Sequence, residues 1–399
     1  MKNILLLTNI YPMNDPAYKG TPVCHYFTRE WMKMGYNVRV VHFMSLFPKP
    51  YYWVGRMFGE KIAAKTGFVT YSHPARTCQR YEVDGVPVLY VPVLKYVPHK
   101  NFAEHRVQEA FKHVCDSLAE EGFVPDAVTA HFPLPQLEML FLFKQKFPAA
   151  KTCLVLHGDG SQIPVIYKEK YPQYMDAVEV WGFRSLAFKN QFEAVFGVKP
   201  HEFLCYSGIP EAYTESVERD FDQGIRKFVF VGSLFKLKNV EVTLKALHLA
   251  FPKHDFEFHV VGDGAEEASL CSLAEELKMQ SQVVFHGRQK RENAQKIMAE
   301  ADCFVMVSSR EAFGLVYVEA MAKGCVAVAT KGQGIDGVIV DGENGFLCES
   351  NNVEALAATL KKIRSLSAEQ LRLISRKAVE TACELTDAKV ATHYLNQIL

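Results

Sequence analysis

Short apolar runs alternate with longer segments of helical periodicity along almost the whole chain of 399 residues. Such runs, bounded by turn residues, are typical of strands buried in a parallel sheet, and each parallel connection needs a crossover, usually a helix. Strands are predicted at Ile4–Thr8, Asn37–Phe43, Ala127–His131, Cys153–Leu156, Phe228–Val231, Phe256–Val261, Val283–Phe285, Phe304–Val307 and Val326–Ala329. Helices are predicted at about Val23–Met34, Ala103–Glu121, Gln136–Lys146, Val240–Ala250, Ala265–Leu277, Asn293–Ala301 and Ala312–Lys323. The pattern predicts an α/β protein.

The length exceeds that of one ordinary domain, and two domains of about 200 residues are expected. Residues 207–226 are polar and lack periodicity, so they are predicted to be a linker. The first domain then covers residues 1–206 and the second 227–385, and a helix over 386–399 is expected to return to the first domain. Each domain is predicted to be a Rossmann-like, doubly wound sheet. Ligands of such sheets bind beyond the carboxyl ends of the strands, which would place a cleft between two facing domains.

The composition, 49% apolar and 23% charged, is that of a soluble globular protein. Ten cysteines are scattered without the CxxC spacing of a metal or redox site, which favours buried free thiols in a reducing compartment. The apolar run near the N-terminus is too short for a signal peptide, and no run has the length of a transmembrane helix. We therefore expect a cytoplasmic protein.

Positive charge is concentrated in the first hundred residues, which hold 13 Lys and Arg against 5 Asp and Glu. Within them, Lys49 to Lys65 mixes aromatic side chains such as Trp53 and Phe58 with cations. Segments of this kind lie well on a membrane surface, so one interpretation is peripheral binding to an anionic leaflet. The alternatives are a helical arm packed on the first domain and a chance asymmetry of solvated charges.

Two carboxylates stand in the mostly apolar stretch SREAFGLVYVEAMAKG, Glu311 and Glu319. An acidic residue at a helix start is stabilised by the macrodipole, which alone could explain Glu311. Glu319 is flanked by apolar residues, and an unpaired carboxylate on a buried helix is costly. Its partner is therefore either a protein group or the hydroxyl of a ligand.

Glycines and cations follow the predicted strands of the second half. Gly232 and Ser233 follow one strand, and Lys238 stands at the start of the next helix, where free N–H groups favour an anion. Gly262 and Arg288 follow two further strands. The set predicts a phosphate or nucleotide site. Tight turns, a surface lysine and a solvated cluster of Arg288 with its cationic neighbours are the alternatives.

Two other motifs carry weaker signals. Gly332, Gly334 and Gly337 have GxGxxG spacing, but turn and strand residues follow them instead of a long helix. Asp220 and Asp222 could chelate a metal, yet no strand precedes them, so we interpret them as a solvated loop. No metal site is predicted.

Two histidines end strands of the first half, His131 and His157. A histidine at the carboxyl end of a strand faces the ligand side of the sheet and can donate to a substrate oxygen. Gly20 follows the first strand, where a glycine backbone would meet a substrate. A structural role for either histidine is the alternative.

These motifs, in this order, resemble those of the family 4 retaining glycosyltransferases of the GT-B fold, from Ile4 to about Leu385. The stretch around Glu311 and Glu319 resembles the E-x7-E motif of that family, and VGSLFKLKN resembles its phosphate loop. Ser233 stands where arginine is usual, and Gly337 where glutamate is usual. QGIDGVIVDGENG, PDAVTAHF, LVLHG and LCYSGIP resemble further segments of the family.

The resemblance implies roles for the residues that match. Glu319 would hold the ribose of a nucleotide sugar, UDP- or GDP-linked, and Glu311 would contact the sugar. N–H groups around Phe313, Gly314 and Leu315 would face the sugar and diphosphate. The remaining implied roles are charge neutralisation on the diphosphate by Lys238, sugar and acceptor contact by His131, and placement in the cleft of His157 and Gly20.

The sequence thus predicts a metal-independent hexosyltransferase that retains anomeric configuration and acts in cell-surface polysaccharide synthesis. It would need no cofactor beyond its co-substrate. Its partners would be the donor, a glycan or lipid-linked glycan acceptor and an anionic membrane surface, with no nucleic acid. The alternatives are a nucleotide-sugar epimerase, a phosphorylase of similar architecture, and a non-catalytic nucleotide-sugar-binding protein. The replacements at Ser233 and Gly337 are the best support for the last.

Overall fold

The computed structural model describes residues 1–399 except 16–17, 19–20, 53–73, 98–100 and 216–217. The chain divides into two compact units. The first comprises Met1–Arg184, Phe188–Tyr206 and Asp387–Leu399, and the second comprises Ser185–Ala187 and Ser207–Thr386. Each unit is built around one sheet, and the fold class predicted from the alternating pattern is confirmed.

The first sheet has the order β3-β4-β2-β1-β5-β6-β7-β8, and only β3 runs antiparallel to its neighbour. Its strands are β1 (Asn3–Thr8), β2 (Asn37–Leu46), β3 (Gln79–Val83), β4 (Val86–Leu94), β5 (Ala127–His131), β6 (Lys151–Leu156), β7 (Val180–Phe183) and β8 (Glu202–Leu204). The strands β3, β4, β7 and β8 were not predicted. Gln79–Val83 is largely exposed and Glu202–Leu204 is only three residues long, so neither forms an apolar run.

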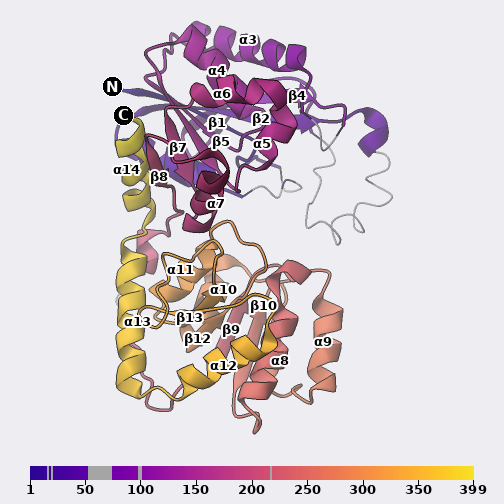
Figure 1. Cartoon of the computed structure of the whole chain (residues 1–399), viewed down its shortest axis with the longest axis vertical. Helices are drawn as coiled ribbons and strands as arrows, with labels where there is room; N and C mark the ends of the chain where they lie inside the picture. The colour runs from indigo at the N-terminus through magenta and orange to yellow at the C-terminus, as the bar shows by residue number, and fades with distance from the viewer. Residues whose placement is uncertain (16–17, 19–20, 53–73, 98–100, 216–217) are drawn as a thin grey trace. The chain divides into compact units, whose positions relative to one another are not determined.

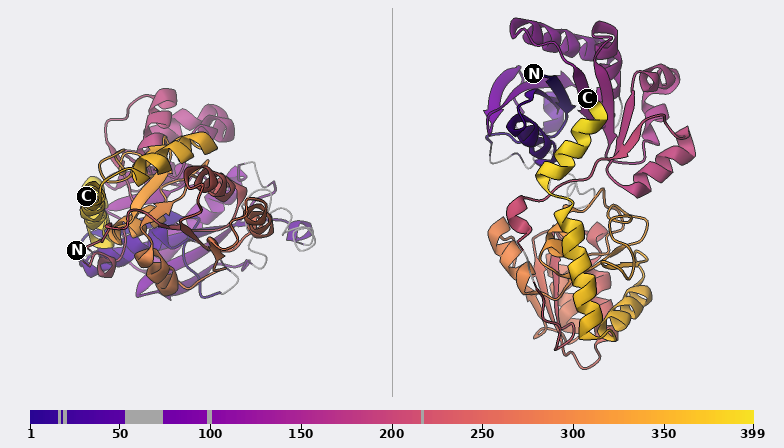
Figure 2. Two further views of the ribbon diagram at one scale, coloured as in Figure 1. Left: turned by 90° about the horizontal axis from the view of Figure 1, so that it is seen from below. Right: turned by 90° about the vertical axis from the view of Figure 1, so that its left-hand side faces the viewer.

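Helices cover both faces of this sheet. They are α1 (Val23–Lys33), α3 (Glu104–Glu120), α4 (Gln136–Lys146), α5 (Gln162–Tyr167), α6 (Tyr171–Asp176), α7 (Leu186–Phe196) and α14 (Asp387–Ile398), with a short 3-10 turn at Lys168–Lys170. The helices α3, α4, α5 and α6 pack on one another, whereas α14 packs against α1 (Figures 1 and 2). The last helix of the chain is therefore part of the first unit.

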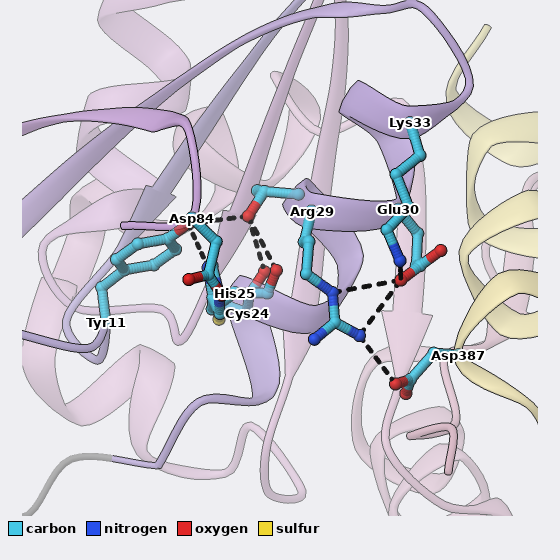
Figure 3. Close-up of polar contacts among 9 residues, drawn as sticks. Tyr11, Cys24, His25, Arg29, Glu30, Lys33, Asp84 and Asp387 are labelled. Carbon is cyan, nitrogen blue, oxygen red and sulfur yellow. Dashed lines mark hydrogen bonds and ion pairs between the residues drawn. The ribbon is translucent and has the colours of Figure 1, made fainter. Parts of the chain in front are cut away.

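Figure 3 shows how α1 is held in the first unit. Arg29 of α1 forms an ion pair with Asp387 of α14 at 3.0 Å. Nε2 of His25 lies 2.8 Å from a carboxylate oxygen of Asp84 in the turn between β3 and β4, and Nδ1 of His25 lies 2.9 Å from the hydroxyl of Tyr11. Trp31 also donates from Nε1 to the carbonyl of Ala391 on α14. Polar contacts therefore fix α1 against α14 and against the turn between β3 and β4.

The second sheet is fully parallel, in the order β11-β10-β9-β12-β13-β14. Its strands are β9 (Lys227–Val231), β10 (Glu257–Val261), β11 (Val283–Phe285), β12 (Cys303–Val305), β13 (Val326–Thr330) and β14 (Phe346–Cys348). Its helices are α8 (Val240–Ala250), α9 (Glu267–Glu276), α10 (Arg291–Glu300), α11 (Leu315–Ala322), α12 (Val353–Arg364) and α13 (Ala368–Cys383), with 3-10 turns at Glu211–Tyr213 and Lys236–Lys238. The helices α8, α9 and α12 form one packed group, and α10, α11 and α13 form the other (Figure 1).

All ten cysteine thiols are free, and most are buried. Among the described residues, no helix combines the length and apolar character that crossing a bilayer requires. The aromatic residues Trp53 and Phe58, together with the rest of residues 53–65, lie outside the described residues.

Candidate active site

The predicted donor-binding residues collect at the carboxyl edge of the second sheet. Its strand order reverses between β9 and β12. At such a reversal the loops after the two strands diverge, which opens the crevice where ligands of parallel sheets bind. Lys238 comes from the segment after β9 and Glu311 from the segment after β12, so the sheet topology brings both to this point.

Lys238 and Glu311 form an ion pair across the reversal. Nζ of Lys238 lies 2.5 Å from Oε2 of Glu311, and the two side chains are 23% and 16% exposed. The backbone of Glu311 is held on both sides, because its N–H donates to Oε1 of Gln333 and its carbonyl accepts from the N–H of Gly334. A partly buried pair with surface still open to solvent can share its ammonium group with an incoming anion.

The helix after Glu311 begins later than predicted. It starts at Leu315 instead of Ala312, because Gly314 adopts a left-handed conformation with φ 83°. A Cβ at Gly314 would lie 2.5 Å from the ring of Tyr317, so only glycine fits there. Phe313 is buried. Leu315 is the first residue of α11, directly after the left-handed turn at Gly314. A helix N-terminus favours negative charge.

Glu319 has protein partners. Its Oε1 accepts from Nη2 of Arg291 at 2.6 Å, and its Oε2 accepts from Nε2 of Gln295 at 2.9 Å. Both partners lie on α10, one helical turn apart, and the guanidinium of Arg291 also lies over the ring of Tyr213. Of the two partners considered from the sequence, a protein group and a ligand hydroxyl, the structure shows protein groups. In the cluster around Arg288, Arg288 and Lys290 are exposed, whereas Arg291, with 37% of its side chain exposed, pairs with Glu319.

The glycines after β9 and β10 are needed for contact between loops. A Cβ at Gly262 would lie 1.8 Å from the carbonyl oxygen of Gly232, and one at Gly264 would lie 2.5 Å from that of Leu234. The two loops therefore touch backbone to backbone. Ser233 and Arg288 are exposed at the same edge of the sheet. This backbone contact explains why Gly262 and Gly264 are glycines.

The first unit brings His131 and His157 together. In the sheet register His131 lies opposite Val155, and His157 follows directly after the end of β6, two residues beyond Val155. Nδ1 of His131 is 2.9 Å from Nε2 of His157. Phe132, at φ 71°, stacks on the ring of His157 with a centroid distance of 3.9 Å. The two histidines therefore act as one hydrogen-bonded unit.

The two rings differ in exposure. His131 is fully buried, and its Nε2 lies 3.3 Å from the hydroxyl of Tyr394 on α14, whereas His157 keeps exposed surface. Burial lowers the pKa of His131 to about 3 and that of His157 well below its ordinary value. His131 was expected to donate directly to a substrate. In this structure both of its ring nitrogens are hydrogen-bonded to protein groups, so neither is available for that contact. His157 is the ring that can meet a ligand.

Other predicted features lie apart from this chemistry. Gly20 falls outside the described residues. Gly334 packs its backbone on Phe313 and so supports the Glu311 loop instead of binding a dinucleotide. Asp222 is exposed and pairs with Arg372. Among the described residues, no three His, Cys, Asp or Glu side chains are grouped to hold a metal ion.

Sequence reasoning missed Arg291, Gln295, Gln333 and Tyr394. Arg291 and Gln295 are four residues apart, a spacing that places them on one helix face and could have indicated a shared partner. Nothing in the local sequence connects Tyr394 with a histidine 263 positions earlier.

Comparison with solved structures identifies the architecture. Anabaena Alr3699/HepE in complex with UDP aligns with a TM-score of 0.68, at 16% identity and over 99% of both chains. The lipopolysaccharide outer core galactosyltransferase WaaB aligns equally well, at 15% identity and over 99% of both chains. The chain has the GT-B fold. At these identities the likeness concerns the fold alone.

The residues that match a known family lie in the second unit. Residues 214–379 match the family of glycosyl transferases group 1. The N-acetyl-alpha-D-glucosaminyl L-malate synthase of Bacillus anthracis is 30% identical over 168 residues, which cover 42% of this chain and 43% of that protein. The match thus spans less than half the length of this relative. Lys238, Glu311 and Glu319 all lie within the family segment.

Proposed function

We propose that this protein is a retaining glycosyltransferase that moves a sugar from a nucleotide-sugar donor to a glycan or lipid-linked glycan acceptor. The Lys238–Glu311 ion pair carries the proposal, because it stands at the strand-order reversal of the second sheet and within the segment matched by the glycosyl transferases group 1 family. The HepE protein was crystallised in complex with UDP, which supports a nucleotide-sugar donor here.

In the proposed reaction the bond between the anomeric carbon and the diphosphate oxygen breaks, and negative charge builds on the departing diphosphate. Lys238 neutralises part of that charge, and the N-terminus of α11 adds its dipole. Glu311 contacts the sugar and keeps Lys238 oriented. The acceptor hydroxyl attacks on the face that the leaving group occupied and passes its proton to the departing diphosphate oxygen, so the configuration is retained and no carboxylate nucleophile is assigned.

Glu319 is proposed to bind the ribose hydroxyls while keeping its bonds to Arg291 and Gln295. A carboxylate oxygen can accept more than one hydrogen bond, so bonds to Arg291 and Gln295 are compatible with contact to a ligand hydroxyl. Arg291 would then hold the carboxylate in place instead of competing for it.

The experiment is a panel of UDP- and GDP-linked sugars, with nucleotide release measured with and without a crude lipid-glycan extract. Acceptor-dependent release, with the anomeric configuration of the product determined by NMR, tests transfer and retention together. Binding of a nucleotide sugar without release would instead favour the non-catalytic binding protein. Sugar isomerisation without an acceptor would favour the epimerase. Activity is expected to persist after exhaustive chelation, and its loss, with recovery on added magnesium or manganese, would contradict the metal-independent mechanism.

Peripheral membrane binding is part of the proposal and rests on the charge of residues 1–100. A basic residue near an anionic leaflet contributes about 1 kcal/mol, so binding should favour anionic lipid and weaken with salt. Flotation with neutral and anionic vesicles at low and high salt measures this. A Trp53→Ala, Phe58→Ala variant should float less, whereas wild-type protein that stays soluble at low salt would contradict membrane binding.

A further inference from the structure

Four side chains of the first unit form one hydrogen-bonded chain that ends at the carboxyl edge of the sheet. The hydroxyl of Thr129 on β5 contacts the hydroxyl of Tyr394, which contacts Nε2 of His131 at 3.3 Å. Nδ1 of His131 contacts Nε2 of His157 at 2.9 Å. Thr129, His131 and Tyr394 are fully buried, and His157 alone of the four keeps exposed surface. A buried group on the last helix is therefore connected by hydrogen bonds to His157, which is only partly buried.

The hydrogen bonds can run in two directions only. Both imidazoles are neutral, because burial holds their pKa values low, and a neutral imidazole donates through one nitrogen and accepts through the other. If Tyr394 donates to His131, then His131 donates to His157, and the proton of His157 must sit on Nδ1. If the direction is reversed, Nδ1 of His157 carries a lone pair. The tautomer of His157 thus depends on the hydroxyl of Tyr394.

The surroundings of Tyr394 favour the first direction. Its ring is enclosed by the aromatic side chains of Phe27, Trp31 and Phe203, with centroid distances of 5.1 to 5.2 Å. In the reversed direction Tyr394 would donate to Thr129, whose own proton would then need another acceptor. The thiol of Cys153 lies beside both hydroxyls, so in the reversed direction either Thr129 or Tyr394 must donate to sulfur, which is a weak acceptor. Donation from Thr129 to Tyr394 and on to His131 satisfies every hydroxyl.

We propose that Tyr394 is a positioning residue that fixes His157 as its Nδ1–H tautomer, so that His157 presents a hydrogen-bond donor to an oxygen of the transferred sugar or of the acceptor. This rests on the proposed transferase function. The stacked ring of Phe132 restricts the His157 ring, so the donor keeps one direction. His157 in this state does not act as the base for the acceptor hydroxyl, because a nitrogen that carries the proton has no lone pair to receive another.

The tautomer can be measured without substrate. The full chain is labelled with ¹⁵N-histidine, and two-bond ¹H–¹⁵N correlation spectra identify the protonated nitrogen of each ring. His157 is assigned by comparison with His157→Gln. Wild-type protein should show His157 protonated at Nδ1 alone at neutral pH. A wild-type His157 protonated at Nε2 would overturn the proposal, and this measurement requires no variant of Tyr394 to fold.

Variants test the source of the preference. Tyr394→Phe keeps the ring in its aromatic enclosure and removes the hydroxyl, so His157 should become a mixture of both tautomers. Thr129→Val should keep the Nδ1–H form, because Tyr394 then has His131 as its remaining polar contact among the four side chains. Tyr90→Phe is the matched control, since it removes another buried tyrosine hydroxyl of the same unit, which donates to the carbonyl of Ala75. An unchanged tautomer in folded Tyr394→Phe would overturn the proposal.

Kinetics separate positioning from a merely structural role. Tyr394→Phe should lower kcat severalfold and change the donor KM less than kcat, because the nucleotide part of the donor is proposed to bind residues of the second unit. Tyr90→Phe should leave both constants near the wild-type values. If no nucleotide sugar is turned over while the spectra behave as expected, the transferase function fails and the Tyr394–His157 coupling stands. A fall in kcat with an unchanged tautomer would assign Tyr394 a structural role instead.

Discussion

The two sheets reverse their strand order at one place each, and they present different chemistry there. In the second unit the reversal between β9 and β12 carries an ion pair, Lys238 with Glu311, at 2.5 Å. In the first unit the reversal lies between β1 and β5, where the side-chain amide of Asn9 donates to the carbonyl of Leu134 at 2.7 Å. Beside it, His131 holds His157 in a neutral hydrogen-bonded pair.

The contrast between an ion pair and neutral hydrogen-bonding groups shows that similar sheets can suit different ligands. An ion pair that is partly open to solvent suits a diphosphate, whose charge it can share. Neutral imidazoles and amides suit sugar hydroxyls, which need directional donors and acceptors but carry no charge. If this contrast is correct, substitutions in the second unit should act through charge and substitutions in the first unit through hydrogen-bond direction or burial.

Glu311→Gln should have the largest effect on turnover. The change keeps the shape of the side chain and removes the charge that orients Lys238. Loss of one such electrostatic group costs about 100- to 1,000-fold in kcat, or about 3 to 4 kcal/mol. Steady-state nucleotide release measures it. Glu276→Gln is the control, because Glu276 is exposed on α9 of the same unit. Turnover within threefold of wild type in Glu311→Gln would remove the charge-based role.

Gly262→Ala should have the next largest effect, a loss of stability that arises from the contact between the loops after β9 and β10. The added Cβ would meet the carbonyl oxygen of Gly232 at 1.8 Å, so the loop after β9 must move. Overpacking of this kind costs about 1 to 3 kcal/mol, and we expect the upper part of that range because backbone is displaced. Urea denaturation gives the stability change, and donor titration shows whether the loop has shifted.

Gly342→Ala separates packing from backbone conformation. Gly342 has φ 78°, but a Cβ there would meet nothing within 4 Å. It should therefore show only the conformational cost of about 1 to 2 kcal/mol and an unchanged donor affinity. Equal behaviour of the two variants would mean that the loop contact has no functional weight.

Glu319→Ala should weaken donor binding by about 1.5 to 3 kcal/mol, because hydrogen bonds to a charged group are lost. Since Arg291 and Gln295 also lose their partner, affinity alone does not identify the ribose. The decisive comparison uses the nucleotide and its 2′-deoxy analogue in competition with the donor. Wild-type protein should prefer the ribonucleotide, and the variant should bind both alike. A preference that survives in the variant would assign Glu319 to structure.

Glu138→Gln should have the smallest effect and tests burial in the first unit. Burial raises the pKa of Glu138 from 4.5 to about 7, with the Glu104 carboxylate contributing. The folded protein therefore keeps this proton between about pH 4.5 and 7 while the unfolded chain releases it, so stability falls as pH rises through that window. The wild-type protein should lose about 1 to 2 kcal/mol there that Glu138→Gln keeps. Parallel pH profiles from chemical denaturation would contradict this.

The fold class and the placement of the candidate residues could be predicted from sequence. Apolar runs such as Cys153–Leu156 and Val326–Ala329 coincide with observed strands, because a strand buried on both faces is largely apolar. Strands without that signature, such as β3 and β8, were missed. The later start of α11 was missed as well, because the left-handed turn at Gly314 is set by its contact with Tyr317.

The sequence by itself determined that this chain forms two parallel α/β sheets with Lys238, Glu311, His131 and His157 close to the carboxyl ends of their strands, since periodicity and chain direction are local properties. Only the tertiary structure decided which groups form hydrogen bonds with the polar side chains. Glu319 found Arg291 and Gln295 on a neighbouring helix, and His131 found Tyr394 on the last helix of the chain. The physical reason is that a buried polar atom bonds to whatever packing brings within about 3 Å, and packing joins residues that sequence separates.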